Sequence, residues 1–111
     1  MFMMFVPAKI VINNEEEYFQ IVWSDGKIYH YPLLGLRRNC PCIMCRGGHD
    51  KMQIFEPLAF NEKASVPVTI RRADQIGNHA IQIHWSDGHN SGMYRWSTLR
   101  DLYEEWKSEA K

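Results

Sequence analysis

The chain reads Ile-Val-Trp-Ser-Asp-Gly at residues 21–26 and Ile-His-Trp-Ser-Asp-Gly at residues 83–88. Each copy of the word Trp-Ser-Asp-Gly is followed by a tyrosine and then by a Leu-Arg pair. A four-residue word that contains tryptophan rarely recurs by chance. The sequence therefore predicts one supersecondary unit that is used twice, over residues 21–37 and 83–100.

Both copies have the pattern of a β-hairpin. Apolar and polar residues alternate before each word, which is typical of a strand with one buried face, and the expected inward residues are Phe19, Ile21, Trp23, Ile81, Ile83 and Trp85. Asp-Gly is a favoured hairpin turn, because both residues tolerate a positive φ. We expect return strands at residues 27–31 and 91–96. Two β-branched segments predict further strands at residues 9–12 and 66–70.

Helical patterns are fewer. Ser97 is a good N-cap, and apolar residues recur at helical spacing after it, which predicts a helix from Thr98 to Ser108. By analogy between the two copies, residues 32–37 form a shorter helical turn, and residues 46–65 form a loop with a short turn. The predicted fold is α+β: a small antiparallel β-sheet of paired hairpins with a C-terminal helix and a metal-binding cysteine turn.

Length and composition limit the possible functions. With 111 residues the chain is expected to form one domain, residues 1–111. Lys and Arg number 13, as do Asp and Glu, so the formal net charge is zero and nucleic-acid binding is not expected. No apolar run approaches the ~20 residues of a membrane span, and the apolar start at residues 1–6 lacks the features of a signal peptide. We therefore expect a cytoplasmic protein.

The three cysteines, Cys40, Cys42 and Cys45, fall within six residues. Thiolates this close converge on one point, and Zn²⁺ in structural sites is held by four cysteines or by three cysteines and one histidine. An iron–sulfur cluster is the competing use of the same thiols. A redox Cys-x-x-Cys pair is a third use, although no βαβ pattern surrounds it.

The fourth ligand has two candidates. His49 follows Cys45 at short local spacing, whereas His89 directly follows the second Asp-Gly turn and would approach the cysteines if the two copies pack as a pair. Spacing alone leaves both open. The claims of His30, His79 and His84 are weaker.

Enzymatic motifs are not found. The chain has no Gly-x-Gly-x-x-Gly, no Walker phosphate loop and no Gly-x-Ser-x-Gly elbow. Asp25 and Asp87 are explained by their place in the turns. We therefore expect a domain that is not an enzyme.

The order of these motifs resembles the gamma-butyrobetaine hydroxylase-like N-terminal domain, whose free-standing bacterial members are a family of unknown function. The resemblance runs from about Ala8 to Tyr103 and rests on both Trp-Ser-Asp-Gly words, on Asn-Cys-Pro-Cys-x-x-Cys and on the histidine after the second Asp-Gly. It implies a zinc site that is formed by Cys40, Cys42, Cys45 and His89. The resemblance thus favours His89 over His49.

The same resemblance implies a role beside other proteins. In the carnitine-pathway hydroxylases, this domain helps to form the dimer, while catalysis uses iron and 2-oxoglutarate in a separate C-terminal barrel that we do not expect here. A related domain is fused to Mrp-type P-loop iron–sulfur carriers, which implies an alternative role in cluster assembly or transfer. The expected partner is thus another protein, an iron–sulfur carrier ATPase or a 2-oxoglutarate oxygenase, and a homo-oligomer is possible. His79 stands where the family often has tyrosine.

Overall fold

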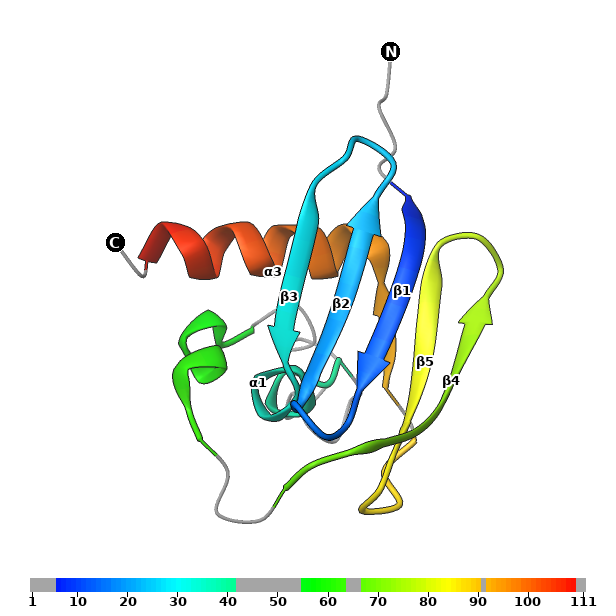
Figure 1. Ribbon diagram of the computed structural model, residues 1–111, viewed down its shortest axis with the longest axis vertical. Coiled ribbons are helices and arrows are strands. Elements are labelled where there is room, and N and C mark those ends of the chain that lie inside the picture. Colours follow the sequence, from blue (N-terminus) through cyan, green and yellow to red (C-terminus); the bar gives the residue numbers. More distant parts are fainter. Residues whose placement is uncertain (1–5, 42–54, 64–66, 91, 110–111) are drawn as a thin grey trace.

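The computed structural model describes residues 6–41, 55–63, 67–90 and 92–109, which form two three-stranded antiparallel sheets and their helices (Figure 1). The first half contains β1 (Pro7–Asn13), β2 (Tyr18–Trp23), β3 (Ile28–Pro32) and α1 (Leu33–Arg38). A 3₁₀ helix, η2 (Pro57–Asn61), follows. The second half contains β4 (Ile70–Ile76), β5 (Ala80–Trp85), β6 (Met93–Arg95) and α3 (Trp96–Glu109).

The predicted repeat is confirmed in the backbone. Both halves run three strands and a helix, with strand orders β1-β2-β3 and β4-β5-β6. The pairing register shifts at the same point of the first strand in each, between Pro7 and Lys9 and between Ile70 and Arg72. The glycine of each Asp-Gly turn has a positive φ, +90° and +88°, so each word closes its hairpin as expected.

The halves are joined by reciprocal tyrosine hydrogen bonds. The Tyr31 hydroxyl of the first half donates to the Leu99 carbonyl of the second at 2.7 Å. The Tyr94 hydroxyl of the second half donates to the Leu36 carbonyl of the first, also at 2.7 Å. Both tyrosines are fully buried, so each hydroxyl needs this partner to offset its loss of water.

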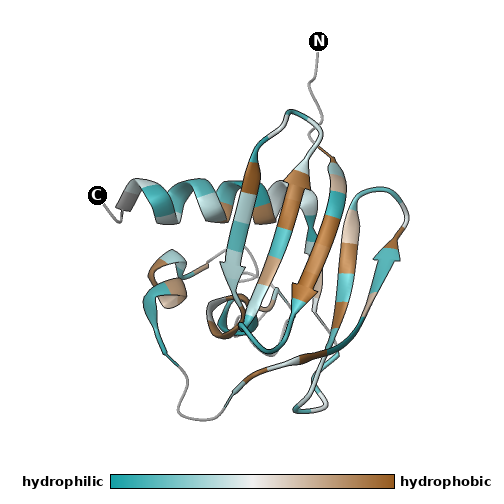
Figure 2. Ribbon diagram, in the orientation of Figure 1, coloured by the Kyte–Doolittle hydropathy of each residue, from teal (hydrophilic) through white to brown (hydrophobic). Residues whose placement is uncertain are grey.

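The core lies on the faces that the alternation predicts. Trp23 and Trp85 are each 1% exposed, and the other expected inward residues of β2 and β5 are also buried. Burial alternates residue by residue along β2, and Figure 2 shows brown hydrophobic bands on this strand interrupted by a teal one. Trp96 and Trp106 are buried and hold α3 against this core. Trp106 donates from Nε1 to the Asn61 side chain at the end of η2.

Three expectations about the elements were wrong. The strand expected at residues 66–70 lies at Ile70–Ile76, because its register is set by pairing with β5 up to the turn at Gly77 rather than by β-branched residues. The segment expected to form a strand to residue 96 instead begins α3 at Trp96. The hairpins do not share one sheet, because each pairs with a strand that precedes it in the chain.

The remaining elements lie close to their predicted positions. The helical turn expected at residues 32–37 is α1, and the predicted C-terminal helix is α3, longer at both ends. The short turn expected within residues 46–65 corresponds to η2. Among the residues that the structure describes, no helix is both long and apolar enough to cross a membrane.

Candidate functional site

Two of the predicted metal ligands lie side by side in the structure. Cys40 follows the end of α1, and His89 lies in the loop between β5 and β6, directly after the second Asp-Gly turn. The Cys40 Sγ is 3.0 Å from the His89 Nε2, although the two residues are 49 positions apart. Cys40 is fully buried. The pair joins the first half of the molecule to the hairpin of the second.

Asn39 holds Cys40 in place. Its side chain is fully buried, and its Nδ2 donates to the Gly35 and Glu56 carbonyls, each at 2.9 Å. Its Oδ1 accepts a hydrogen bond from the Glu56 backbone N–H. Asn39 therefore ends α1 and connects the two sides of the segment that contains the other cysteines. Sequence reasoning quoted this residue in the motif without assigning it a role.

His89 is positioned by the geometry of its turn. The Asp87 Oδ1 accepts the His89 backbone N–H at 3.1 Å, and the Trp85 backbone N–H donates to the His89 carbonyl at 2.9 Å. Gly92 lets the returning chain approach the sulfur, since a Cβ at this position would lie 2.6 Å from the Cys40 Sγ.

The surroundings of His89 favour a neutral imidazole. Burial lowers the pKa of His89, and the nearby Arg37 guanidinium lowers it further, while Asp87 partly opposes both. Arg37 itself donates from Nε to the Asp87 Oδ2 at 3.1 Å. A neutral imidazole nitrogen and a cysteine thiolate are donors that zinc prefers, so the two side chains could supply half of a tetrahedral site.

The other predicted ligands cannot be placed. Cys42, Cys45 and the competing His49 lie outside the described residues. Within the described ranges, no group of three or more His, Cys, Asp or Glu side chains could hold a metal ion. Of the predicted set of four, the described part of the chain contains Cys40 and His89.

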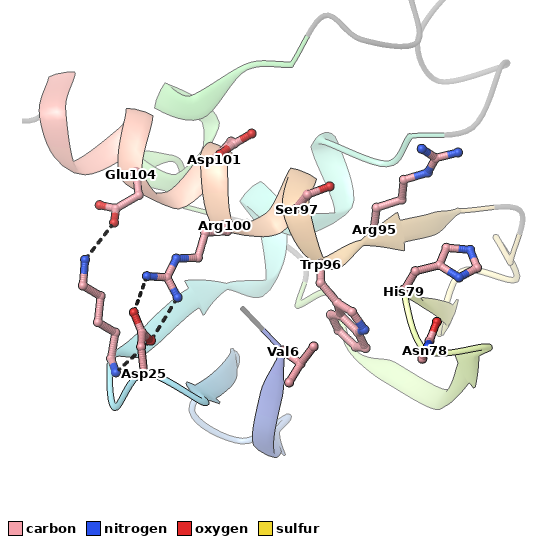
Figure 3. Close-up of a pocket in the computed structure, with 11 residues that line it drawn as sticks. Val6, Asp25, Asn78, His79, Arg95, Trp96, Ser97, Arg100, Asp101 and Glu104 are labelled. Carbon is pink, nitrogen blue, oxygen red and sulfur yellow. Dashed lines mark hydrogen bonds and ion pairs between the residues drawn. The ribbon is translucent and has the colours of Figure 1, made fainter. Parts of the chain in front are cut away.

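His79 lines a groove that is separate from the Cys40–His89 pair. It lines a groove of about 810 Å³ between the first hairpin turn and α3, together with Trp96 and Arg95 (Figure 3). The charges at the other end of this groove pair with one another: Arg100 binds both Asp25 oxygens, at 3.1 and 2.6 Å, and Lys27 contacts Glu104. The Cys40–His89 pair does not line it.

Two ion pairs tie the turns to the opposite halves. Asp25 of the first turn pairs with Arg100 of α3, and Asp87 of the second turn pairs with Arg37 of α1. The hydrogen bond from Arg100 holds the pKa of Asp25 below its usual range. Sequence reasoning assigned the aspartates only to their turns; the Leu-Arg pair that follows each copy was the available signal for this exchange.

Known proteins are similar to this chain in sequence and in fold. The chain is 33% identical over 76 residues to the gamma-butyrobetaine dioxygenase of Pseudomonas sp. (strain AK-1), a match that covers 67% of this chain but only 18% of that enzyme. The crystal structure of a protein of unknown function of the DUF971 family, from Acidithiobacillus ferrooxidans ATCC 23270, matches with a TM-score of 0.64 and 28% identity, covering 86% of this chain and 90% of the other.

A further structure, solved by NMR, shares the fold. Its TM-score is 0.68 at 18% identity, and the match covers 96% of this chain and 80% of the other. The family described as gamma-butyrobetaine hydroxylase-like, N-terminal, matches residues 10–100. The chain therefore belongs to the family of gamma-butyrobetaine hydroxylase-like N-terminal domains.

Proposed function

We propose that this protein is a small zinc-binding accessory domain whose metal has a structural role. The observation that carries the proposal is the 3.0 Å approach of the Cys40 Sγ to the His89 Nε2 across two separate elements. Cys42 and Cys45 are the proposed remaining ligands, since they follow Cys40 within five residues. When bound, the ion would supply a covalent-like link between the end of α1 and the second hairpin.

The donor set supports a structural rather than a catalytic site. Three thiolates and one imidazole would fill the four positions of a tetrahedral ion, so no position would remain for substrate or water. Cys40 is fully buried, and Gly92 is packed against its sulfur. The surrounding residues orient the two donors and keep the Cys40 sulfur out of water. We accordingly propose a domain that is not itself an enzyme.

We further propose that the domain acts by binding another protein. The chain spans 18% of the length of the dioxygenase that it matches, and that enzyme therefore carries a similar domain beside a much longer polypeptide. An oxygenase is thus the first partner to test, and an iron–sulfur carrier ATPase and a second copy of the chain are the others. The proposed location is the cytoplasm. Light scattering on the purified protein, alone and with an oxygenase, measures both associations.

Elemental analysis with an absorption spectrum tests the metal site. The protein is purified anaerobically without a metal-affinity tag, and the expected result is one zinc per chain with no visible absorbance. His89→Ala is expected to lose the zinc, whereas His49→Ala and His84→Ala retain it. No bound metal, or equal loss in all three variants, would overturn the proposed site. Iron with sulfide and a brown colour would instead support the iron–sulfur alternative.

A further inference from the structure

A second pocket lies on the outer face of the second half, next to the proposed metal site. It has a volume of about 350 Å³ and is lined by Arg71, Arg72, His84, Trp85, Gly88 and Asn90. No carboxylate lines it, although the chain as a whole has as many acidic as basic residues. The lining combines two guanidinium groups, an imidazole and a side-chain amide, all of which can donate hydrogen bonds.

Asp74 orients two of these groups from the side. Its Oδ1 accepts from the Arg72 Nε at 2.9 Å, and its Oδ2 lies 3.1 Å from the His84 Nε2. The Nη groups of Arg72 are left without a hydrogen bond among the described residues. Arg71 makes no ion pair within that same part of the chain. Two guanidinium charges and one carboxylate therefore leave a local charge of about +1.

The first half provides an internal comparison for this pocket. Its register pairs Lys9 with Val22 where the second half pairs Arg72 with His84. Ala8 stands in the place of Arg71, and Ile28, which is 59% exposed, stands in the place of Asn90. The same backbone thus forms without the polar lining, so the fold does not require these side chains.

From these contacts we infer that the pocket binds the phosphate group of a small molecule or inorganic phosphate itself. Guanidinium groups match the geometry of phosphate oxygens and bind them with charge-assisted hydrogen bonds. The N–H groups of Arg71, of the Arg72 Nη atoms and of the Asn90 amide together exceed what the two oxygens of a carboxylate can accept, while the His84 Nε2 faces Asp74. Asp87, next to the pocket at Gly88, does not oppose an anion freely, because Arg37 pairs with it.

Titration of the purified protein, followed by ¹⁵N–¹H NMR, tests this inference. The probes are inorganic phosphate and glycerol phosphate, each added at constant ionic strength against chloride. We expect saturable shifts at the amides of residues 71, 72, 84, 88 and 90. Tighter binding of glycerol phosphate would identify an organic phosphate as the ligand, and equal binding would identify phosphate itself.

Arg71→Ala and Lys9→Ala form the matched pair of variants. Each removes one exposed positive charge from the first strand of its half, at neighbouring positions of the two registers. Arg71→Ala is expected to weaken phosphate binding about tenfold or more, and Lys9→Ala by less than twofold. Shifts that do not saturate, or equal weakening in both variants, would overturn the inference. Unchanged unfolding temperatures show that both variants remain folded.

Discussion

The two halves of this molecule place different chemistry at the same point of one backbone plan. In the first half, Lys27 follows the Asp-Gly turn and its Nζ contacts Glu104 of α3 at 3.5 Å, with both side chains about half exposed. In the second half, His89 follows the turn and its Nε2 lies 3.0 Å from the buried Cys40. The position after the Asp-Gly turn therefore holds a solvated ion pair in the first half and a thiol–imidazole pair with a buried sulfur in the second.

The difference between the two pairs follows from the lengths of the helices, because α3 is much longer than α1. α3 runs to Glu109 and places Tyr103 and Glu104 beside the first hairpin, where Tyr103 stacks on Tyr29 with ring centroids 4.1 Å apart. α1 ends at Arg38, and the Asn39 side chain then donates a hydrogen bond to the Glu56 carbonyl rather than continuing the helix along the second hairpin. Aromatic rings therefore pack against the first hairpin, whereas the Cys40 sulfur lies against the second.

The largest expected effect is the difference in stability between His89→Ala and Lys27→Ala. If zinc links α1 to the second hairpin, His89→Ala loses the metal and lowers the free energy of unfolding by at least about 3 kcal/mol, because metal binding and folding are coupled. Lys27→Ala removes only an exposed ion pair and costs less than about 1 kcal/mol. Urea unfolding with metal analysis of each variant checks this. Equal destabilisation would show that the two pairs have the same structural role.

The next effect concerns the contact of α1 with η2. A Cβ at Gly35 would lie 2.6 Å from the Phe60 Cα and 2.8 Å from its backbone nitrogen, so Gly35→Ala forces η2 away and costs about 1–3 kcal/mol. The corresponding residue of α3 is Thr98, which already has a Cβ, and Thr98→Ala should stay within about 1 kcal/mol. Thermal unfolding measures both. A stable Gly35→Ala variant would mean that η2 packs loosely.

The two crossed ion pairs are expected to differ in strength. Arg100 is bidentate to Asp25 and lies 5.2 Å from the centroids of the Trp23 and Tyr29 rings, with its side chain 11% exposed. Arg100→Met should lower the unfolding temperature on the order of 8 °C.

Arg37 provides the matched comparison. Its side chain is 23% exposed and makes one hydrogen bond to Asp87, so Arg37→Met should lower the unfolding temperature by less than half as much. Calorimetry of both variants at matched metal content checks the order. A larger loss from Arg37 would indicate that this residue supports the metal site.

The smallest effect is a dependence on acid. The hydrogen bond from Arg100 lowers the pKa of Asp25 below its usual 3.8. Such a carboxylate contributes its full stability above the unfolded pKa and loses it as the pH falls toward the lower folded pKa. Between about pH 5 and about pH 3, the free energy of unfolding should fall more steeply in the wild type than in Asp25→Asn.

Comparison with Asp25→Asn controls for the metal. Protonation of the proposed ligands would weaken both proteins alike, so the difference in slope reports the carboxylate. Urea unfolding at several pH values measures it. Parallel slopes would show that the pKa of Asp25 is the same in the folded and the unfolded protein, and that Arg100 does not lower it.

Much of the fold could be predicted because the information is local. The alternation around Trp23 and Trp85 predicted their burial, and the Asp-Gly pairs predicted the turns. β4 was misplaced because it is an edge strand with the polar pattern Arg71-Arg72-Ala73-Asp74, which carries little β-strand signal. Spacing could not choose between His49 and His89, because the approach of Cys40 to the second hairpin depends on how the halves pack.

The sequence by itself determined that a hairpin unit is used twice, that its tryptophans are buried and that three thiols are clustered, since each follows from residues close together in the chain. Only the tertiary structure decided what the halves exchange: each tyrosine hydroxyl, each turn aspartate and the Cys40 sulfur finds its partner in the opposite half. Contacts of this kind join residues about 50 to 75 positions apart, and their pairing depends on burial across the whole core rather than on any local pattern.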